Sequence, residues 1–131
     1  MVQVAGVEIV PTKAISADVT LGKAIEFLLS ENLPMLMVVD AAEKIIGVVS
    51  ETRLLAAAFD TPLQTDPVSL HIERKFISIS PDSDLEQIVE TFLLHRVRHL
   101  PVIGADRRAI GILSRRDVLR HLADVSVTGS R

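Results

Sequence analysis

The sequence contains no cysteine, no tryptophan and no tyrosine, and four phenylalanines are its only aromatic side chains. Without cysteine, disulfide bonds and thiolate chemistry are excluded, and the composition fits a cytoplasmic protein. Aliphatic residues must therefore form the core. The first ten residues have no basic stretch before an apolar one, so they do not resemble a signal peptide. The longest apolar run, 33–39, is far shorter than the roughly 20 residues that span a bilayer.

Features of a catalytic site are also scarce. There is no glycine-rich phosphate loop of the nucleotide-hydrolase type. The four histidines, His71, His95, His99 and His121, show no metal-binding pattern with matching carboxylates. We therefore expect a protein that is not an enzyme, with no metal and no prosthetic group.

The charge is unevenly spread along the chain. Residues 1–65 hold four Lys or Arg against eight Asp or Glu, whereas residues 66–131 hold ten against nine. The extra basic residues cluster at 95–99, 107–108 and 115–116. Such clusters indicate either a phosphate-binding surface or a solvated face. Nucleic-acid binding is a weaker alternative, because no aromatic residues are interleaved there for base stacking.

An internal repeat organises the chain. When the sequence is shifted by 64 residues, residues 15–58 align with 79–122 without a gap, and thirteen of the 44 pairs are identical. Chance would give roughly three. The identical pairs include Gly47 with Gly111 and Ser50 with Ser114. Two copies favour a pseudo-twofold pair over an open solenoid.

Both copies predict the same order of elements, β-α-β-β-α. Extended pieces at 13–16 and 76–80 precede amphipathic helices that begin near residues 21 and 85. Ser83 and Glu86 are expected to form a capping box at the start of the second of these helices. Buried strands follow at 36–39 and 45–49, and at 100–103 and 109–113, and a second helix follows Ser50 and Ser114. Residues 59–67 are expected to be a connector, and residues 126–131 a frayed tail.

Several segments carry a resemblance to a known family. Gly47-Val-Val-Ser50 and Gly111-Ile-Leu-Ser114-Arg-Arg-Asp117 resemble the CBS-domain pattern, as do residues 79–85 and 95–102. The resemblance covers about residues 8–123. It implies an α/β (α+β) fold with two β-α-β-β-α CBS repeats, 1–65 and 66–131, packed about a pseudo-twofold axis as a stand-alone Bateman module. In this family, clefts between the repeats often bind AMP, ADP, ATP or S-adenosylmethionine, and the module regulates another protein.

Asp117 is the principal candidate for ligand binding. It follows Ser114 by three residues, in the first turn of a helix, where free N–H groups also favour a phosphate. Its carboxylate can accept hydrogen bonds from both hydroxyls of a ribose. The alternative is that Ser114 and Asp117 form only a capping box. By resemblance, His99, Leu100 and Pro101 would line an adenine pocket. The candidates for neutralising phosphates are Arg98, Arg115 and Arg116.

The first copy departs from the pattern, because Arg53 aligns with Asp117 and Met37 with Pro101. A guanidinium cannot accept from ribose hydroxyls, so we expect one nucleoside cleft and one degenerate or anion-binding cleft. By resemblance, the Asp117 cleft would also use first-copy residues, namely Lys13, Ala14, Pro34 and Met35. The candidates for the degenerate cleft are Ser50, Arg53, Ser78 and His99. Gly47 and Gly111 lie within strands, where the missing side chain lets a ligand or another backbone come close; the alternative is close packing of the sheet on a helix.

The leading hypothesis is a homodimeric regulatory module that binds an adenine nucleotide or S-adenosylmethionine and controls a separate effector protein. Exposed helix faces, with Leu21, Ile25 and Leu28 or with Leu54 and Leu55, are expected to form the dimer contact. The alternatives are a structural dimerisation or docking module without a ligand, and a weak nucleic-acid binder.

Overall fold

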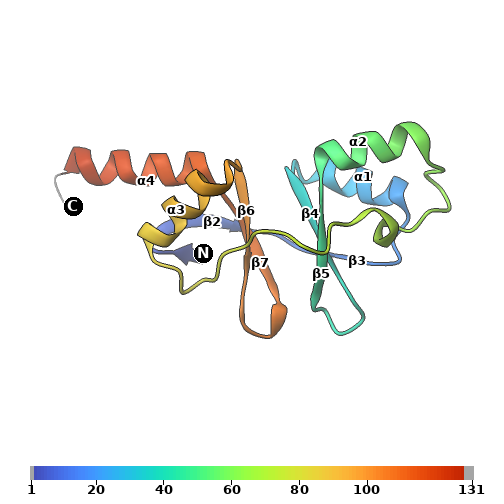
Figure 1. The fold of residues 1–131 in the computed structure, drawn as a ribbon, viewed down its shortest axis with the longest axis horizontal. Helices are drawn as coiled ribbons and strands as arrows, with labels where there is room; N and C mark the ends of the chain where they lie inside the picture. The colour runs from blue at the N-terminus through green and yellow to red at the C-terminus, as the bar shows by residue number, and fades with distance from the viewer. Residues whose placement is uncertain (1, 129–131) are drawn as a thin grey trace. The chain divides into compact units, whose positions relative to one another are not determined.

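The computed structural model describes residues 2–128 and confirms the mixed α/β class (Figure 1). By their contacts, these residues form two compact units. The first-copy unit consists of Lys13–Phe76 with Asp106–Arg108. The second-copy unit consists of Ile77–Ala105, the described residues from Ala109 onward, and those up to Thr12. The start of the chain therefore packs with the second copy of the repeat.

The first-copy unit is a three-stranded sheet with two helices packed against it (Figure 1). Strand β3 runs parallel to β4, and β4 runs antiparallel to β5. The apolar residues of α1 recur at helical spacing, so Leu21, Ala24 and Leu28 are buried against the sheet. Its elements are β3 (Ile15–Ser16), α1 (Leu21–Ser30), β4 (Met35–Val39), β5 (Ile45–Ser50), α2 (Glu51–Asp60) and the 3-10 helix η1 (Val68–His71).

The second-copy unit has a four-stranded antiparallel sheet in the order β1-β2-β7-β6. Helices α3 and α4 contribute Ile88, Phe92 and Val118 to a core that also holds Leu100 and Leu113 of the sheet. Its helices and strands are β1 (Val2–Val4), β2 (Val7–Pro11), α3 (Leu85–His95), β6 (His99–Ile103), β7 (Ala109–Ser114) and α4 (Arg115–Thr128). The short 3-10 helix η2 (Ala105–Arg107) lies between β6 and β7.

The repeat predicted from the sequence is also a repeat of strand register. Met35 pairs with Ser50 in the β4–β5 hairpin, and His99 pairs with Ser114 in the β6–β7 hairpin. Both hairpins keep this correspondence along their whole length, including an irregularity just before the last residue of β4 and of β6. The 64-residue shift thus relates backbone hydrogen bonds as well as residue types.

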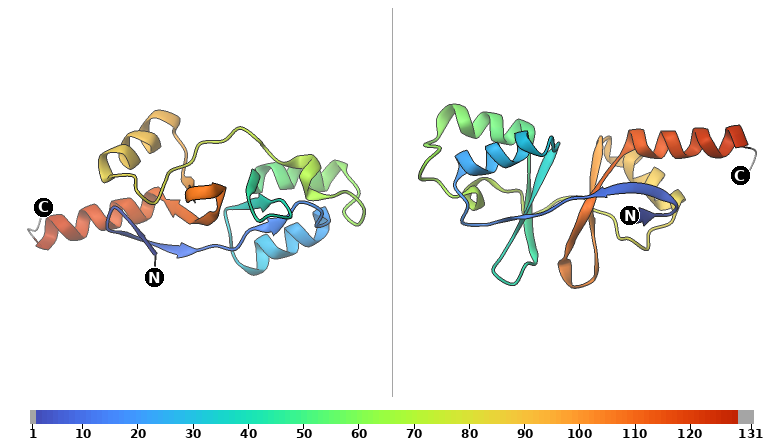
Figure 2. Two further views of the ribbon diagram at one scale, coloured as in Figure 1. Left: turned by 90° about the horizontal axis from the view of Figure 1, so that it is seen from below. Right: turned by 180° about the vertical axis from the view of Figure 1, so that it is seen from behind.

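The hairpin of β1 and β2 is absent from the sequence prediction. Ala5 and Gly6 both have positive φ angles, 51° and 84°, and form the tight turn between the strands. Val4, Val7 and Ile9 enter the core of the second-copy unit, and β2 extends the sheet by pairing with β7. Figure 2 shows the end of the blue strand β2 meeting the orange β7.

Four local predictions were wrong. The extended piece predicted at 76–80 forms no strand of the second-copy sheet, and Ile79 makes only an isolated parallel bridge to Val102. Asp84, not Ser83, caps α3, because its side chain accepts from the Gln87 N–H while the Gln87 side chain accepts from the Asp84 N–H. Residues 126–128 belong to α4 rather than to a frayed tail, and residues 129–131 lie outside the described residues. Leu21, Leu28 and Leu54 are core residues, so they do not form an exposed helix face.

Within residues 2–128, no helix combines the length and apolar character needed to cross a membrane.

Candidate functional site

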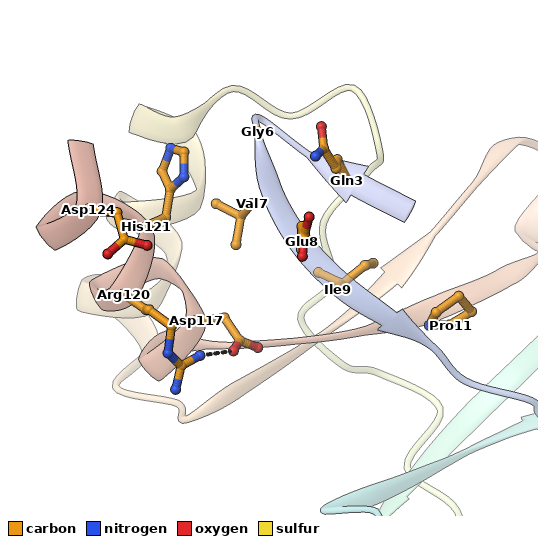
Figure 3. A pocket seen from close by; sticks show the side chains of 10 residues that line it. All are labelled: Gln3, Gly6, Val7, Glu8, Ile9, Pro11, Asp117, Arg120, His121 and Asp124. Carbon is orange, nitrogen blue, oxygen red and sulfur yellow. Dashed lines mark hydrogen bonds and ion pairs between the residues drawn. The ribbon is translucent and has the colours of Figure 1, made fainter. Parts of the chain in front are cut away.

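A groove of about 640 Å³ lies within the second-copy unit, between α4 and the β1–β2 hairpin. Figure 3 shows the side chains of α4 on one side of it and those of β2 on the other. The helix comes close to the hairpin turn, since a Cβ on Gly6 would lie 3.3 Å from His121 Cε1. The residues that line the groove are Gln3, Gly6, Val7, Glu8, Ile9, Pro11, Asp117, Arg120, His121 and Asp124. Its volume lies within the usual range for small-molecule sites.

Asp117 lines this groove from the first turn of α4. Ser114 ends β7, and its Oγ accepts a hydrogen bond of 3.0 Å from the Asp117 N–H. The Arg115 N–H donates to the Arg98 carbonyl at 3.0 Å, which fixes the start of α4 to the segment before β6. The helix start is thus held by two bonds, and the Asp117 side chain projects into the groove.

The Asp117 carboxylate is paired with a residue that the sequence analysis missed. Arg120 Nη1 donates to Asp117 Oδ1 at 2.8 Å, and Figure 3 marks this contact. The Asp117 side chain is 34% exposed and that of Arg120 is 65% exposed. The bond engages one oxygen, so Oδ2 and a further lone pair of Oδ1 can accept from a ligand. The spacing of three residues on a predicted helix was the signal that could have identified Arg120.

The other second-copy candidates do not line the groove. Arg98, Arg115 and Arg116 are exposed, and Arg98 contributes its backbone carbonyl to the helix start. Pro101 is buried in β6 opposite Ile112, and its carbonyl accepts from the Ile79 N–H. Among the predicted second-copy ligand residues, only Asp117 is therefore a lining residue of this groove, with Ser114 supporting it from the end of β7.

The first-copy candidates lie in the other unit. Lys13 is exposed and Ala14 is half-buried, just before β3. The Pro34 carbonyl accepts a bond of 3.4 Å from the Glu51 N–H, at the start of α2, and Met35 begins β4 opposite Ser50. Their contribution to one cleft with Asp117 stays a prediction.

Arg53, at the position aligned with Asp117, holds the segment that leads from the first copy to the second. Its backbone N–H donates to Ser50 Oγ at 3.1 Å, the counterpart of the Ser114 bond. Its side chain, however, donates through Nε to the His71 carbonyl at 2.7 Å and lies 3.6 Å from Glu73 Oε1. The same part of the chain is held by His71 Nε2, which is 3.1 Å from Asp66 Oδ2. Arg53 thus has a structural role in the first-copy unit.

The remaining candidates for a degenerate cleft belong to both units. Ser78 is exposed in the second-copy unit, and His99 begins β6 in the same unit. Ser50 acts as the N-cap of α2. Their assembly into a second cleft stays a prediction.

Gly47 allows another backbone segment to approach β5. A Cβ at this position would lie 2.7 Å from the Glu73 carbonyl oxygen and 2.8 Å from Ile72 Cδ1. Val48 and Glu73 exchange backbone hydrogen bonds of 3.0 and 2.7 Å. At Gly47 the missing side chain therefore makes room for the backbone of a neighbouring segment.

The groove has the features of a binding site. It combines apolar residues of β2 with polar groups of α4, which suits a ligand that is part apolar and part hydrogen-bonding. In the part of the chain that the structure describes, no group of three or more His, Asp or Glu residues is placed to hold a metal ion.

Comparison with known proteins gives a consistent result. The family model of the CBS domain matches residues 7–60 and 68–124. An uncharacterized 17.7 kDa protein of Acidianus ambivalens is 28% identical over 111 residues, which cover 85% of this chain and 67% of that protein. Inosine-5'-monophosphate dehydrogenase of Methanocaldococcus jannaschii is 27% identical over 106 residues, or 81% of this chain. The match covers only 21% of that enzyme, so the similarity is confined to a small part of it.

Solved structures share the fold. The chain is similar to CBSX2, solved in complex with AMP, with a TM-score of 0.78 and 26% identity over 94% of this chain and 98% of that one. It is also similar to the CBS domain pair of protein MJ0100, solved with 5-methylthioadenosine and S-adenosyl-L-methionine, with a TM-score of 0.73. That second match has 17% identity and covers 95% of this chain and 98% of the other, so it supports the fold alone.

Proposed function

The chain belongs to the CBS-domain family, and from that premise we propose that it senses an adenosine compound and regulates a separate protein. The ligand is an adenine nucleotide (AMP, ADP or ATP) or S-adenosylmethionine. The chain itself carries out no catalysis in this proposal. Ligand binding changes the stability and shape of the protein, and the effector protein responds to that change.

One observation carries the proposal, namely the Asp117 carboxylate at the edge of the groove. Ser114 fixes the helix turn on which Asp117 lies, and Asp117 keeps acceptor sites on both of its oxygens. Two adjacent ribose hydroxyls are donors, and hydrogen bonds to an ionised acceptor are the stronger kind. A ribose is therefore well matched to this carboxylate.

The relatives support the ligand class. CBSX2 is solved with AMP, and it is similar to this chain over nearly the whole length of both. Proteins of one fold can bind different ligands, so the main support for the ligand of this chain is Asp117 and its groove.

We also propose a homodimer in the cytoplasm. Each unit exposes leucines at equivalent positions of the repeat: Leu29 and Leu55 in the first-copy unit, and Leu93 and Leu119 in the second-copy unit. Exposed leucines on adjacent helices favour contact with a second copy, because a twofold contact covers the same surface on both chains. The absence of cysteine supports a reducing compartment.

A thermal-shift experiment tests the ligand. AMP, ATP or S-adenosylmethionine at 100 times its Kd should stabilise the folded state by about 2.7 kcal/mol and raise the melting temperature by several degrees. Inorganic phosphate at the same concentration is the control, because it has the charge without the ribose. If no adenosine compound raises the melting temperature at millimolar concentration, the proposed function is wrong.

A further inference from the structure

The groove beside Asp117 carries an unequal set of charges. Glu8, Asp117 and Asp124 contribute carboxylates, whereas Arg120 is the only Lys or Arg among the described residues that line it. Glu8 comes from β2 and the other charged residues come from α4, so both walls carry negative charge. A ligand that brings a phosphate group into this groove therefore encounters one guanidinium among three carboxylates.

Arg120 has the geometry to bind an anion while it remains paired with Asp117. A guanidinium has five N–H donors in one plane, and the bond to Asp117 Oδ1 involves Nη1. With a side chain that is 65% exposed, Arg120 can direct its other donors toward a ligand in the groove. Planar, paired donors of this kind suit a phosphate.

We propose that Arg120 is a specificity-determining residue, which selects between adenosine compounds by the charge of the group on the 5′ carbon of the ribose. This rests on the proposed function, in which Asp117 accepts from the ribose hydroxyls. The 5′ group lies across the same sugar ring, so a residue one helical turn from Asp117 is suitably placed to contact it. When Arg120 is present, its guanidinium contacts the 5′-phosphate of a ligand in the groove. When Arg120 is removed, the three carboxylates repel that phosphate.

The simpler role of Arg120 is an ion pair on the helix surface. Ion pairs spaced by three residues on an exposed helix contribute little to stability, and they do not distinguish one ligand from another. If Arg120 determines specificity, its replacement changes the ratio of the affinities for AMP and adenosine. If Arg120 only pairs with Asp117, that ratio does not change. These two ligands share the base and the ribose and differ at the 5′ carbon.

Isothermal titration calorimetry with AMP and with adenosine measures this ratio. The full chain is compared with the variants Arg120→Gln and Arg120→Lys. Arg74→Gln is the matched control, since Arg74 is exposed and lies in the first-copy unit.

In Arg120→Gln the affinity for AMP should fall about tenfold. This loss is at the lower end of the range for a hydrogen bond to a charged group, because Arg120 is largely exposed. The affinity for adenosine should change by less than about threefold, since a lost surface ion pair has only a small effect. Arg120→Lys should lie between the wild type and Arg120→Gln for AMP, because it keeps the charge and loses the planar donors.

Several outcomes would overturn the proposal. Equal losses of AMP and adenosine affinity in Arg120→Gln would show that Arg120 only positions Asp117. Unchanged affinity for both ligands would show that Arg120 does not contact the ligand. If the wild type binds adenosine and AMP equally, there is no selection by 5′ charge. A wild type that binds neither would contradict the proposed function itself, and this inference with it. Melting curves of each variant confirm that it is folded.

Discussion

At the scale of single residues, the two copies use one aligned position for opposite chemistry. Asp117 presents a carboxylate to a groove, whereas Arg53 donates to the His71 carbonyl and lies near Glu73. Both follow a serine whose Oγ accepts their backbone N–H. Both copies thus share the same helix start, and they differ in the side chain of its first turn. Asp117 lines a groove, whereas Arg53 holds the segment that contains His71 and Glu73.

Replacement of Arg53 tests its structural role. Arg53→Ala removes the bond to His71 and the exposed ion pair with Glu73, and we expect a loss of about 0.5–1.5 kcal/mol, mostly from the hydrogen bond. The melting temperature should fall by a few degrees in thermal denaturation followed by circular dichroism. Arg74→Ala removes a nearby exposed arginine and should have little effect. Equal melting temperatures for Arg53→Ala and Arg74→Ala would show that Arg53 does not hold this segment.

Sequence alone could identify some of these residues but not their contacts. The pattern around Ser114 and Asp117 indicated either a capping box or an acceptor for ribose. The structure shows the Ser114 cap and places the Asp117 carboxylate in a groove, while the ribose contact stays a prediction. For Gly47, the cost of glycine in a strand indicated a close approach. That the approaching atoms belong to Glu73 and Ile72 depends on tertiary structure, because those residues are distant in sequence.

At the scale of elements, the repeat made prediction reliable where it applied. Two aligned copies give each periodic pattern twice, so the helix starts and the hairpin strands of both copies were predicted close to their observed positions. The first strand predicted for the second copy, at 76–80, is reduced to one isolated bridge. The β1–β2 hairpin lies before the aligned region and had no second copy to support it. Its alternation of apolar and polar residues on either side of Ala5 and Gly6 was nevertheless a hairpin signal. Arg120 and His121 become groove residues only because this hairpin lies beside α4.

The hairpin should contribute to the stability of the second-copy unit. Val4 is fully buried in its core, whereas Val2, on the same strand, is only partly buried. Val4→Ala should lower the free energy of unfolding by about 1–3 kcal/mol, since it removes buried methyl groups and leaves a cavity. Val2→Ala is the matched control and should have a smaller effect in urea denaturation. If both variants unfold at the same urea concentration, the hairpin does not pack as described.

At the scale of the whole molecule, exposed apolar side chains recur with the repeat. Leu55 is 72% exposed and its counterpart Leu119 is 63% exposed, while Phe59 on α2 is 90% exposed. The face predicted from the sequence included Leu21, Leu28 and Leu54, which are buried instead. Periodicity located the apolar positions of each helix, but it could not separate residues that face the core from apolar residues left on the surface.

Light scattering tests the homodimer. At micromolar concentration the chain should have about twice its own mass of 14.3 kDa. A variant with Leu55→Glu and Phe59→Glu together should shift toward the monomer, because charges cannot be buried unpaired in an apolar contact. Leu70→Glu is the control, since Leu70 is also exposed but lies on η1 rather than on α2. A monomeric wild type would contradict the proposed dimer.

The central claim is that Asp117 accepts hydrogen bonds from the ribose of an adenosine compound. Titration calorimetry with AMP on the wild type, Asp117→Ala and Arg53→Ala tests it most directly, because the two substitutions remove aligned residues from the two copies. The wild type should bind about one strongly held AMP per chain. Asp117→Ala should weaken that binding about ten- to hundredfold, the loss expected for a hydrogen bond to a charged group, and Arg53→Ala should retain it. AMP binding by Asp117→Ala with wild-type affinity, or two equal sites per chain in the wild type, would contradict the claim.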